Sequence, residues 1–273
     1  MSASVGVALH GARGRMGREL LALMKQSSGL RLEAALDRAD AEEQGEEVQR
    51  FAPGAPGGVC LTADLEAACQ RADVVVDFSA PSALVELAGV CARLGKPLVT
   101  GTTGLDAAAE RAVAELAERV AVVAAPNFSQ GVTLLFHLAE LASRRLGPDF
   151  DAEIVEAHHR RKVDAPSGTA ARLAEIVTRA KAMDARDAVV FGRQGQVGAR
   201  PDAEVGVLSV RGGDIVGEHT LFLIGQGERL ELTHRATDRA IFARGALRAA
   251  RWVVGRAPGR YDMKDVMGLS AAD

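Results

Sequence analysis

The sequence predicts an α/β fold in two parts: a doubly wound parallel sheet with helices on both faces, then an α+β part with a mixed sheet. Three observations support this prediction. Apolar runs alternate with helix-like stretches along the first part of the chain, as they do where a parallel sheet is buried on both faces. Strand-like segments dominate residues 151–235. The length of 273 residues exceeds that of a typical single core, so two domains are expected.

The first part opens with a strand, a turn and a helix. Residues 5–9 form the apolar run VGVAL, glycines follow, and apolar residues through Met24 recur at helical spacing. A second helix is expected over 82–94, because Pro81 suits a first helical turn. The stretch 42–60 is rich in Glu, Gly and Pro and predicts a loop. The remaining strands expected here are 31–37, 73–79, 97–103 and 120–125.

A domain boundary is expected near residues 125–131 (APNFSQG), where the alternation stops. A helix-like run follows to Leu146, and another strong helical pattern covers 169–182. From about 239 the chain turns helical again. The strands expected in the second part are 151–157, 205–211, 219–224 and 229–235.

Composition excludes several classes of function. With 33 Lys and Arg against 36 Asp and Glu, the chain has no basic excess that would draw it to nucleic acid or anionic lipid. No window reaches the roughly 18 to 20 apolar residues of a membrane span, so a cytoplasmic protein is expected. The three cysteines, Cys60, Cys69 and Cys91, show neither disulfide nor zinc spacing, so no metal site is expected. A catalytic thiol stays open as an alternative.

The glycines of HGARGRMG lie between the first strand and the first helix. Gly11, Gly14 and Gly17 would let the backbone turn tightly and approach a pyrophosphate at the helix N-terminus, although a plain tight turn would use the same residues. Asp37 closes the second strand, where an acid can accept hydrogen bonds from adenosine ribose hydroxyls. The adjacent Arg38 could pair with a 2′-phosphate, so NADH and NADPH both come into question, or it is a solvated surface charge.

Two further segments carry candidate chemistry. GTTG at 101–104 ends a predicted strand, where its amides and hydroxyls could hold the nicotinamide half of a dinucleotide, or form a bare loop. The stretch 156–170 (EAHHRRKVDAPSGTA) gathers histidines, cations and a helix start. Its imidazoles suit proton exchange near neutrality, and the helix start suits a carboxylate. The alternatives are structural histidines, a solvated charge run and a simple N-cap. Together the motifs predict a reductase that passes a hydride from a nicotinamide dinucleotide to a small anionic substrate.

Seven motifs in order, GARGRMG, VDFSAP, GTTG, APNFSQGV, EAHHRRKVDAPSGTA, RGGDIVGEHT and YDMKDVMGL, resemble the 4-hydroxy-tetrahydrodipicolinate (dihydrodipicolinate) reductase family nearly end to end. The resemblance implies a Rossmann-like dinucleotide domain at 1–128, completed by 239–273. It implies a substrate-binding and tetramerisation domain at 129–238. It also implies hydride transfer from NADH or NADPH to a cyclic imine dicarboxylate in the diaminopimelate route to lysine, by a homotetramer.

The resemblance assigns roles to individual positions. His158 corresponds to the proton donor, Lys162 to a second donor, and His159, Gly168 and Thr169 to substrate contacts. The positions that correspond to cofactor contacts are Gly11, Ala12, Arg13, Gly14, Arg15, Met16, Asp37, Arg38, Gly101, Thr102, Thr103, Ala125, Pro126, Asn127 and Phe128.

Three positions depart from the family pattern. Arg13 stands where many members have glycine, His10 stands where a small residue is common, and Asp37 replaces the glutamate of some members. These departures leave the preference between NADH and NADPH open.

Two rival functions remain. The first is another two-domain dehydrogenase of a small carboxylate, such as aspartate semialdehyde, whose chemistry needs a nucleophilic cysteine. The second is a dinucleotide sensor without catalysis, since a fold does not dictate a function. The complete stretch from His158 to Thr169 argues against the second rival.

Overall fold

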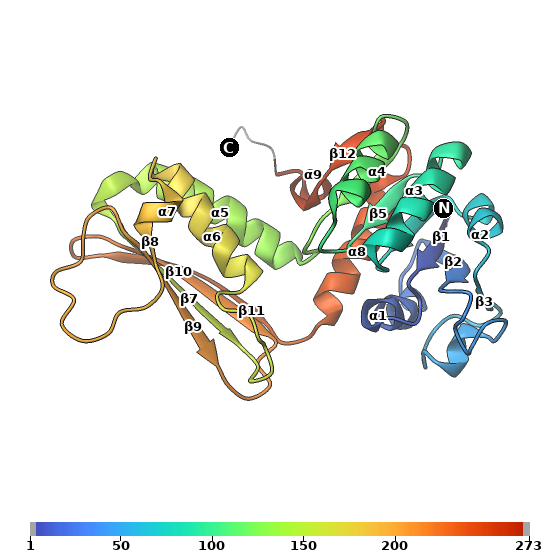
Figure 1. Ribbon diagram of the computed structural model, residues 1–273, viewed down its shortest axis with the longest axis horizontal. Coiled ribbons are helices and arrows are strands. Elements are labelled where there is room, and N and C mark those ends of the chain that lie inside the picture. The colour runs from blue at the N-terminus through green and yellow to red at the C-terminus, as the bar shows by residue number, and fades with distance from the viewer. Residues whose placement is uncertain (1–3, 270–273) are drawn as a thin grey trace. The chain divides into compact units, whose positions relative to one another are not determined.

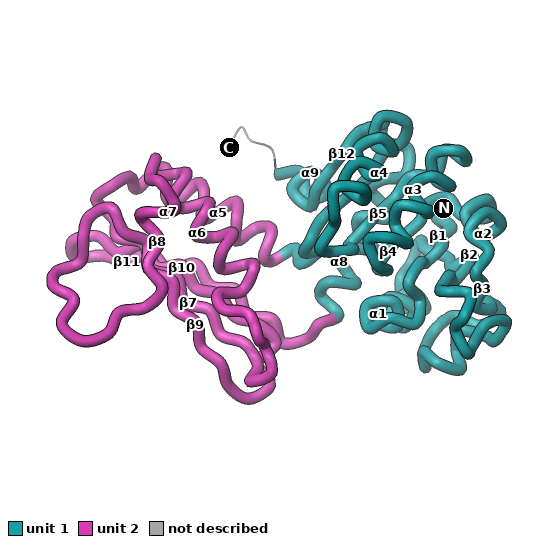
Figure 2. The backbone as a smooth tube through the Cα atoms, viewed as in Figure 1, with its two compact units in different colours: residues 1–130, 240–270 teal, residues 131–239, 271–273 magenta. Residues whose placement is uncertain are grey.

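A computed structural model describes residues 4–269. The chain divides into two compact units (Figure 2). Unit 1 joins residues 1–130 to 240–270, and unit 2 consists of residues 131–239. Each unit has its own sheet and its own hydrophobic core, so each is described by itself.

Unit 1 is built on a seven-stranded sheet in the order β12-β6-β5-β4-β1-β2-β3, with parallel pairing throughout. The predicted parallel sheet is confirmed. Two strands are shorter than expected: β4 ends at Asp77 and β5 at Thr100, so Phe78, Ser79 and residues 101–103 form loops at the sheet edge. The strands are β1 (Val5–His10), β2 (Leu30–Leu36), β3 (Leu61–Thr62), β4 (Val74–Asp77), β5 (Leu98–Thr100), β6 (Ala121–Ala124) and β12 (Gly259–Tyr261).

Helices cover both faces of this sheet, as predicted (Figure 1). Val7 and Leu9 of β1 pack in the cluster that contains α1 and α8, while Ala8 between them packs in the cluster of α2, α3 and α4. Because successive side chains of a strand point to opposite faces, strands buried on both sides must be apolar throughout. The helices are α1 (Arg15–Met24), α2 (Leu65–Arg71), α3 (Pro81–Leu94), α4 (Ala107–Ala117), α8 (Ala240–Val253) and α9 (Met263–Met267).

The stretch 42–60 is irregular apart from a 3-10 turn at Val48–Arg50 and an isolated antiparallel bridge between Glu47 and Cys60. It is nevertheless packed, because Val48, Phe51 and Ala55 are buried in the same cluster as α1. Their spacing follows neither a helical nor a strand period, because they anchor an irregular loop to the core.

Unit 2 holds a five-stranded sheet in the order β11-β10-β7-β9-β8. β10 runs antiparallel to both β7 and β11, whereas β7 and β8 pair with β9 in parallel, so the predicted mixed sheet is confirmed. The elements are α5 (Gln130–Leu146), β7 (Asp151–His158), α6 (Gly168–Ala180), α7 (Ala185–Ala188), β8 (Val189–Val190), β9 (Val205–Arg211), β10 (Gly217–Ile224) and β11 (Arg229–Ala236).

The helices of unit 2 lie on one face of its sheet (Figure 1). Ile154 and Leu221 point to that face and are fully buried against α5 and α6. Strand alternation places Leu208, Val210 and Ile224 on the other face, where 39, 48 and 37% of each residue is exposed. Over residues 4–269, no helix is both long and apolar enough to cross a membrane.

Candidate active site

The turn between β1 and α1 admits only glycine at two places. Gly11 has φ +79°, and a Cβ there would lie 2.4 Å from the carbonyl oxygen of Phe78. A Cβ on Gly17 would lie 2.2 Å from the carbonyl oxygen of Gly11. Gly14 caps α1 without a side-chain hydrogen bond. The first amides of α1 are therefore open to an anion that approaches the positive end of the helix.

The strand order reverses between β1 and β4, and open α/β sheets bind ligands outside the carboxyl ends of their strands at such a point. The residues predicted to contact a cofactor follow four of the parallel strands. Gly11–Met16 follow β1, Asp37 and Arg38 follow β2, residues 101–103 follow β5, and residues 125–128 follow β6. The fold thus brings all four segments to one edge of the sheet.

Asp37 links the second strand to the glycine turn. Its carboxylate accepts hydrogen bonds from the backbone amide of Arg13 at 2.8 Å and from that of Arg38 at 3.0 Å. The Arg13 side chain is drawn to Glu43, with 2.5 Å between Nε and Oε2. Arg38 is exposed, its Nε 3.5 Å from Asp40. Asp37 is thus oriented beside the turn while the Arg38 guanidinium faces solvent.

Four of the predicted cofactor residues, Ala12, Thr102, Ala125 and Phe128, have buried side chains. Ala12 is fully buried, and Phe128 is 2% exposed with its ring centroid 5.6 Å from that of Phe78. The Phe78 ring also lies against Gly101, where a Cβ would come within 2.1 Å of it. The side chains of Ala12 and Phe128 therefore pack inside unit 1 and are closed to solvent.

A polar row crosses the sheet of unit 2 on its helix-covered face. Glu156 of β7 pairs in register with Ser209 of β9 on one side and with His219 of β10 on the other. Glu156 is fully buried, and His219 is 4% exposed. The row lies two residues beyond Ile154, where the apolar core ends.

Glu156 connects His158, the predicted proton donor, to Ser167 at the start of α6. Its Oε2 lies 2.6 Å from Nδ1 of His158, and its Oε1 accepts the backbone amide of Ser167 at 3.1 Å. Arg211 donates to both oxygens, at 2.9 and 2.7 Å. Burial alone would raise the pKa of Glu156, but hydrogen bonds from Arg211, Ser209 and His158 lower it to about 2. The carboxylate is therefore charged at neutral pH.

With Nδ1 directed at Glu156, His158 has Nε2 as its other proton-carrying atom. The ring fits because residue 217 is glycine, since a Cβ there would lie 2.9 Å from Nε2. The ring of His219 meets that of His158 edge-on, with centroids 5.2 Å apart. Burial and the charge of His158 lower the pKa of His219 to about 4, so His219 is neutral at pH 7.

Ser167 caps α6. Its Oγ accepts the amide of Ala170 at 3.2 Å and contacts Nε2 of His219 at 2.9 Å. Gly168 and Thr169 occupy the first turn, where backbone amides have no carbonyl partner within the helix. Ser167 at the start of α6 is thus held by neutral His219 through its hydroxyl and by charged Glu156 through its amide.

The remaining predicted residues lie on the segment between β7 and α6. The Nζ of Lys162 donates to both carboxylate oxygens of Asp164, at 2.8 and 2.7 Å, and this hydrogen bonding lowers the pKa of Asp164. Nε2 of His159 lies 3.2 Å from Nη2 of Arg239, and slight burial together with the charge of Arg239 lowers the pKa of His159. The Asp164 carbonyl accepts Nη2 of Arg211 at 2.7 Å, which ties the segment to Glu156.

Sequence reasoning assigned no role to Glu156, Arg211, Gly217 or His219. A signal existed for Glu156, because it precedes His158 by two residues on a strand and so shares its face. The other three come from RGGDIVGEHT, and their contacts with β7 depend on strand pairing that spacing does not reveal.

The cysteines do not join this cluster. Cys69 and Cys91 are buried, Cys60 is exposed, and the sequence has none between residues 131 and 239. A nucleophilic thiol is therefore not part of the histidine site of unit 2.

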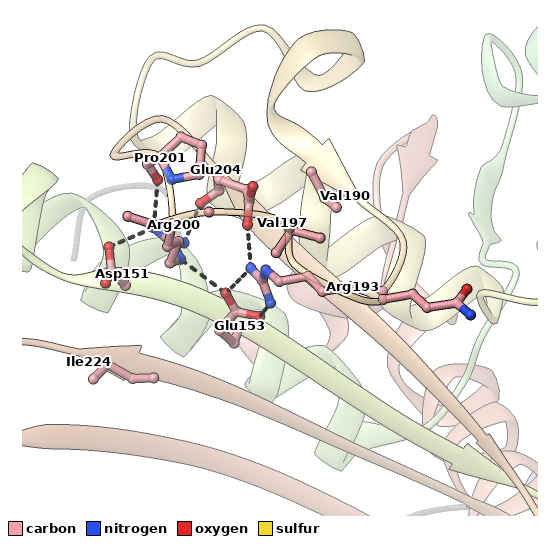
Figure 3. Close-up of a pocket in the computed structure, with 13 residues that line it drawn as sticks. Asp151, Glu153, Val190, Arg193, Val197, Arg200, Pro201, Glu204 and Ile224 are labelled. Carbon is pink, nitrogen blue, oxygen red and sulfur yellow. Dashed lines mark hydrogen bonds and ion pairs between the residues drawn. The ribbon is translucent and has the colours of Figure 1, made fainter.

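A separate hollow of about 550 Å³ in unit 2 is lined by Arg193 and Arg200 (Figure 3). Arg193 is bonded to Glu153 and Glu204, and Arg200 to Glu153 and Asp151. Since carboxylates already neutralise both guanidinium groups, the hollow offers neither of them unpaired to an anionic ligand.

Comparisons with known proteins agree on one family. Family models described as dihydrodipicolinate reductase, N-terminus and C-terminus, match residues 5–128 and 131–267. A 4-hydroxy-tetrahydrodipicolinate reductase of Thiobacillus denitrificans is 52% identical over 97% of this chain and 99% of its own. One of Anaeromyxobacter dehalogenans is 48% identical over 96% of this chain and 97% of its own. Among solved structures, a dipicolinate-bound dihydrodipicolinate reductase from Paenisporosarcina matches with a TM-score of 0.75 and 27% identity, covering 95% of this chain and 97% of that one.

Proposed function

The chain belongs to the dihydrodipicolinate reductase family, and from that premise we propose how its two units divide the reaction. It is an NAD(P)H-dependent oxidoreductase of the diaminopimelate route to lysine. It reduces 4-hydroxy-tetrahydrodipicolinate, by way of dihydrodipicolinate, to tetrahydrodipicolinate. When bound, NADH or NADPH supplies the hydride.

The dinucleotide-binding domain, residues 1–128 completed by 239–273, is built on unit 1. The crowding at Gly11 and Gly17 and the uncapped start of α1 fit a pyrophosphate, so the segment from Gly11 to Met16 holds it. Asp37 accepts a ribose hydroxyl, and the exposed Arg38 pairs with the 2′-phosphate when NADPH is used. Residues 101–103 and 125–128 hold the nicotinamide half.

The substrate domain, residues 129–238, is built on unit 2, and the bond between His158 and buried Glu156 is the observation that carries its assignment. Hydride addition to the carbon–carbon double bond conjugated with the imine leaves electron density on the resulting enamine, whose carbon a nearby acid must protonate. His158 gives that proton from Nε2, while charged Glu156 stabilises the imidazolium before transfer. Lys162 is the second donor, and Asp164 fixes the position of its ammonium group.

The substrate is a dicarboxylate, and unit 2 offers groups for an anion. The free amides of Gly168 and Thr169 receive one carboxylate at the start of α6, and His159 contacts the same molecule. The relative from Paenisporosarcina was solved with dipicolinate, a ring dicarboxylate of this kind.

The uncovered face of the unit 2 sheet supports a homotetramer. Leu208, Val210 and Ile224 expose apolar surface on a face that no helix of its own unit covers. Light scattering should give four times the mass of 28.6 kDa. The enzyme works in the cytoplasm, where NAD(P)H and its substrate are made.

A pair of histidine variants tests the acid. His158→Ala should lower kcat roughly a hundredfold or more, as loss of a general acid does. Its affinities for NADH and dipicolinate, measured by calorimetry, should stay close to the parent values. His137→Ala removes a histidine from α5 of the same unit and should leave kcat unchanged. Equal rates for His158→Ala and the parent would remove His158 from the reaction.

A further inference from the structure

A buried carboxylate in unit 1 has no part in the function described above. Asp77 ends β4 and is fully buried. His10 Nδ1 and Ser79 Oγ contact its Oδ1 at 2.8 and 2.6 Å. Thr100 and Thr102 donate to its Oδ2 at 2.8 and 2.7 Å. Burial would raise the pKa of Asp77, but its bonds to His10, Ser79 and Thr102 and the charge of His10 lower it, so the group is held ionised.

These four partners come from three strand ends. His10 ends β1 and immediately precedes Gly11, Ser79 follows β4, and Thr100 ends β5. Asp77 lies in register with His10 on one side and with Thr100 on the other. The amide of Ser79 also donates to Oγ1 of Thr102 at 3.1 Å. One carboxylate thus connects the glycine turn to the segment 101–103.

Stability alone does not explain this cluster. Elsewhere β1, β4 and β5 are filled by apolar side chains such as Leu9, Val75 and Leu98, all fully buried. Well-packed apolar residues often stabilise a core as well as or better than a buried ionic group. The charged carboxylate of Asp77 lies at the end of β4, next to the segments after β1 and β5 that are assigned to the dinucleotide.

We propose that Asp77 is a positioning residue for the dinucleotide, with His10 and Thr100 as its links to the two flanking segments. The cluster holds Gly11 and residues 101–103 at a fixed spacing before binding. Less conformational entropy is therefore lost when the dinucleotide binds. The inference rests on the proposed cofactor site.

Isosteric variants separate positioning from folding. Thr100→Val keeps the shape of the side chain and removes its hydrogen bond to Asp77, together with the longer one, at 3.3 Å, that Oγ1 accepts from the amide of Thr102. Thr178→Val is the matched control, because Thr178 is equally buried in α6 and bonds only carbonyls of its own helix. His10→Leu removes the imidazole, whereas His10→Asn keeps a nitrogen close to the position of Nδ1 and should rescue the bond.

The readout is the Kd for NADH by calorimetry, with kcat and both KM values from steady-state kinetics. Thr100→Val and His10→Leu should each raise the Kd and KM for NADH roughly tenfold, the equivalent of one hydrogen bond. At saturating NADH, kcat and the KM for the imine substrate should stay within about twofold of the parent. Thr178→Val and His10→Asn should match the parent.

Unchanged NADH affinity in folded Thr100→Val and His10→Leu would overturn the inference. So would an equal loss of kcat and of both affinities, because that pattern marks a folding residue. If the parent protein itself bound no NADH, the proposed cofactor site would fail instead.

Discussion

Replacing Glu156 by glutamine tests whether a charge, and not merely a shape, positions the acid. The variant keeps the side-chain volume and an oxygen that can accept from Nδ1 of His158. It removes the negative charge that faces both His158 and Arg211. The imidazolium form of His158 then loses its counter-charge at 2.6 Å.

The expected fall in kcat follows from the hydrogen bonds that the substitution weakens. A hydrogen bond to a charged group is worth about 1.5–3 kcal/mol, and a neutral one about 0.5–1.5 kcal/mol. The loss of about 1–2 kcal/mol at His158 should lower kcat about 5- to 30-fold. Arg211, whose side chain is 21% exposed, also loses its charged partner and keeps only carbonyl acceptors, which should lower the free energy of unfolding by about 3 kcal/mol.

Glu153→Gln is a matched control on the same strand. Glu153 also bonds two arginines, Arg193 and Arg200, but alternation places it on the opposite face from Glu156. It should reduce stability in urea unfolding without reducing kcat. A parental kcat for Glu156→Gln, or an equal loss of kcat for Glu153→Gln, would refute the positioning of His158 by Glu156.

Four further outcomes are expected. Lys162→Ala should lower kcat roughly a hundredfold with the Kd for NADH nearly unchanged, and an unchanged kcat would remove it as a donor. Asp37→Ala should raise the Kd for NADH more than that for NADPH, and a uniform rise would detach Asp37 from the ribose. Since the pKa of His219 is about 4 in the fold and 6.5 in the unfolded chain, the unfolded state binds more protons between these values. The free energy of unfolding should therefore rise by about 3 kcal/mol from pH 4 to 6.5, and His219→Asn should flatten that rise. Cys60→Ser should keep full turnover. A loss of turnover in this variant would instead favour the thiol chemistry of a semialdehyde dehydrogenase.

Long apolar runs and strong helical periods predicted most of the fold. Helices α2 and α4 were not predicted, although Asp106 caps α4 by accepting two amides, and Ala109, Val113 and Leu116 recur at helical spacing. It also missed β3 and β12, whose two and three residues are too short for any period to show. Such short strands form only because neighbouring strands already offer a sheet edge.

For the site, too, residues close together in the chain were predicted and residues brought together by strand pairing were not. The residues of HHRRKVDAPSGT were found because strand, segment and helix start are contiguous in the chain. Arg211 and His219 reach Glu156 from β9 and β10, and strand register alone sets those contacts. The network around Asp77 also went unnoticed, since its partners are spread from residue 10 to residue 102.

The most direct test of the account is oxidation of NADH and of NADPH by the purified protein, with substrate made in situ from pyruvate and aspartate semialdehyde by the preceding synthase. We expect rapid oxidation that requires the synthase and falls about a hundredfold or more in His158→Ala. Dinucleotide binding without any oxidation would contradict it and would favour a sensor built on the same fold.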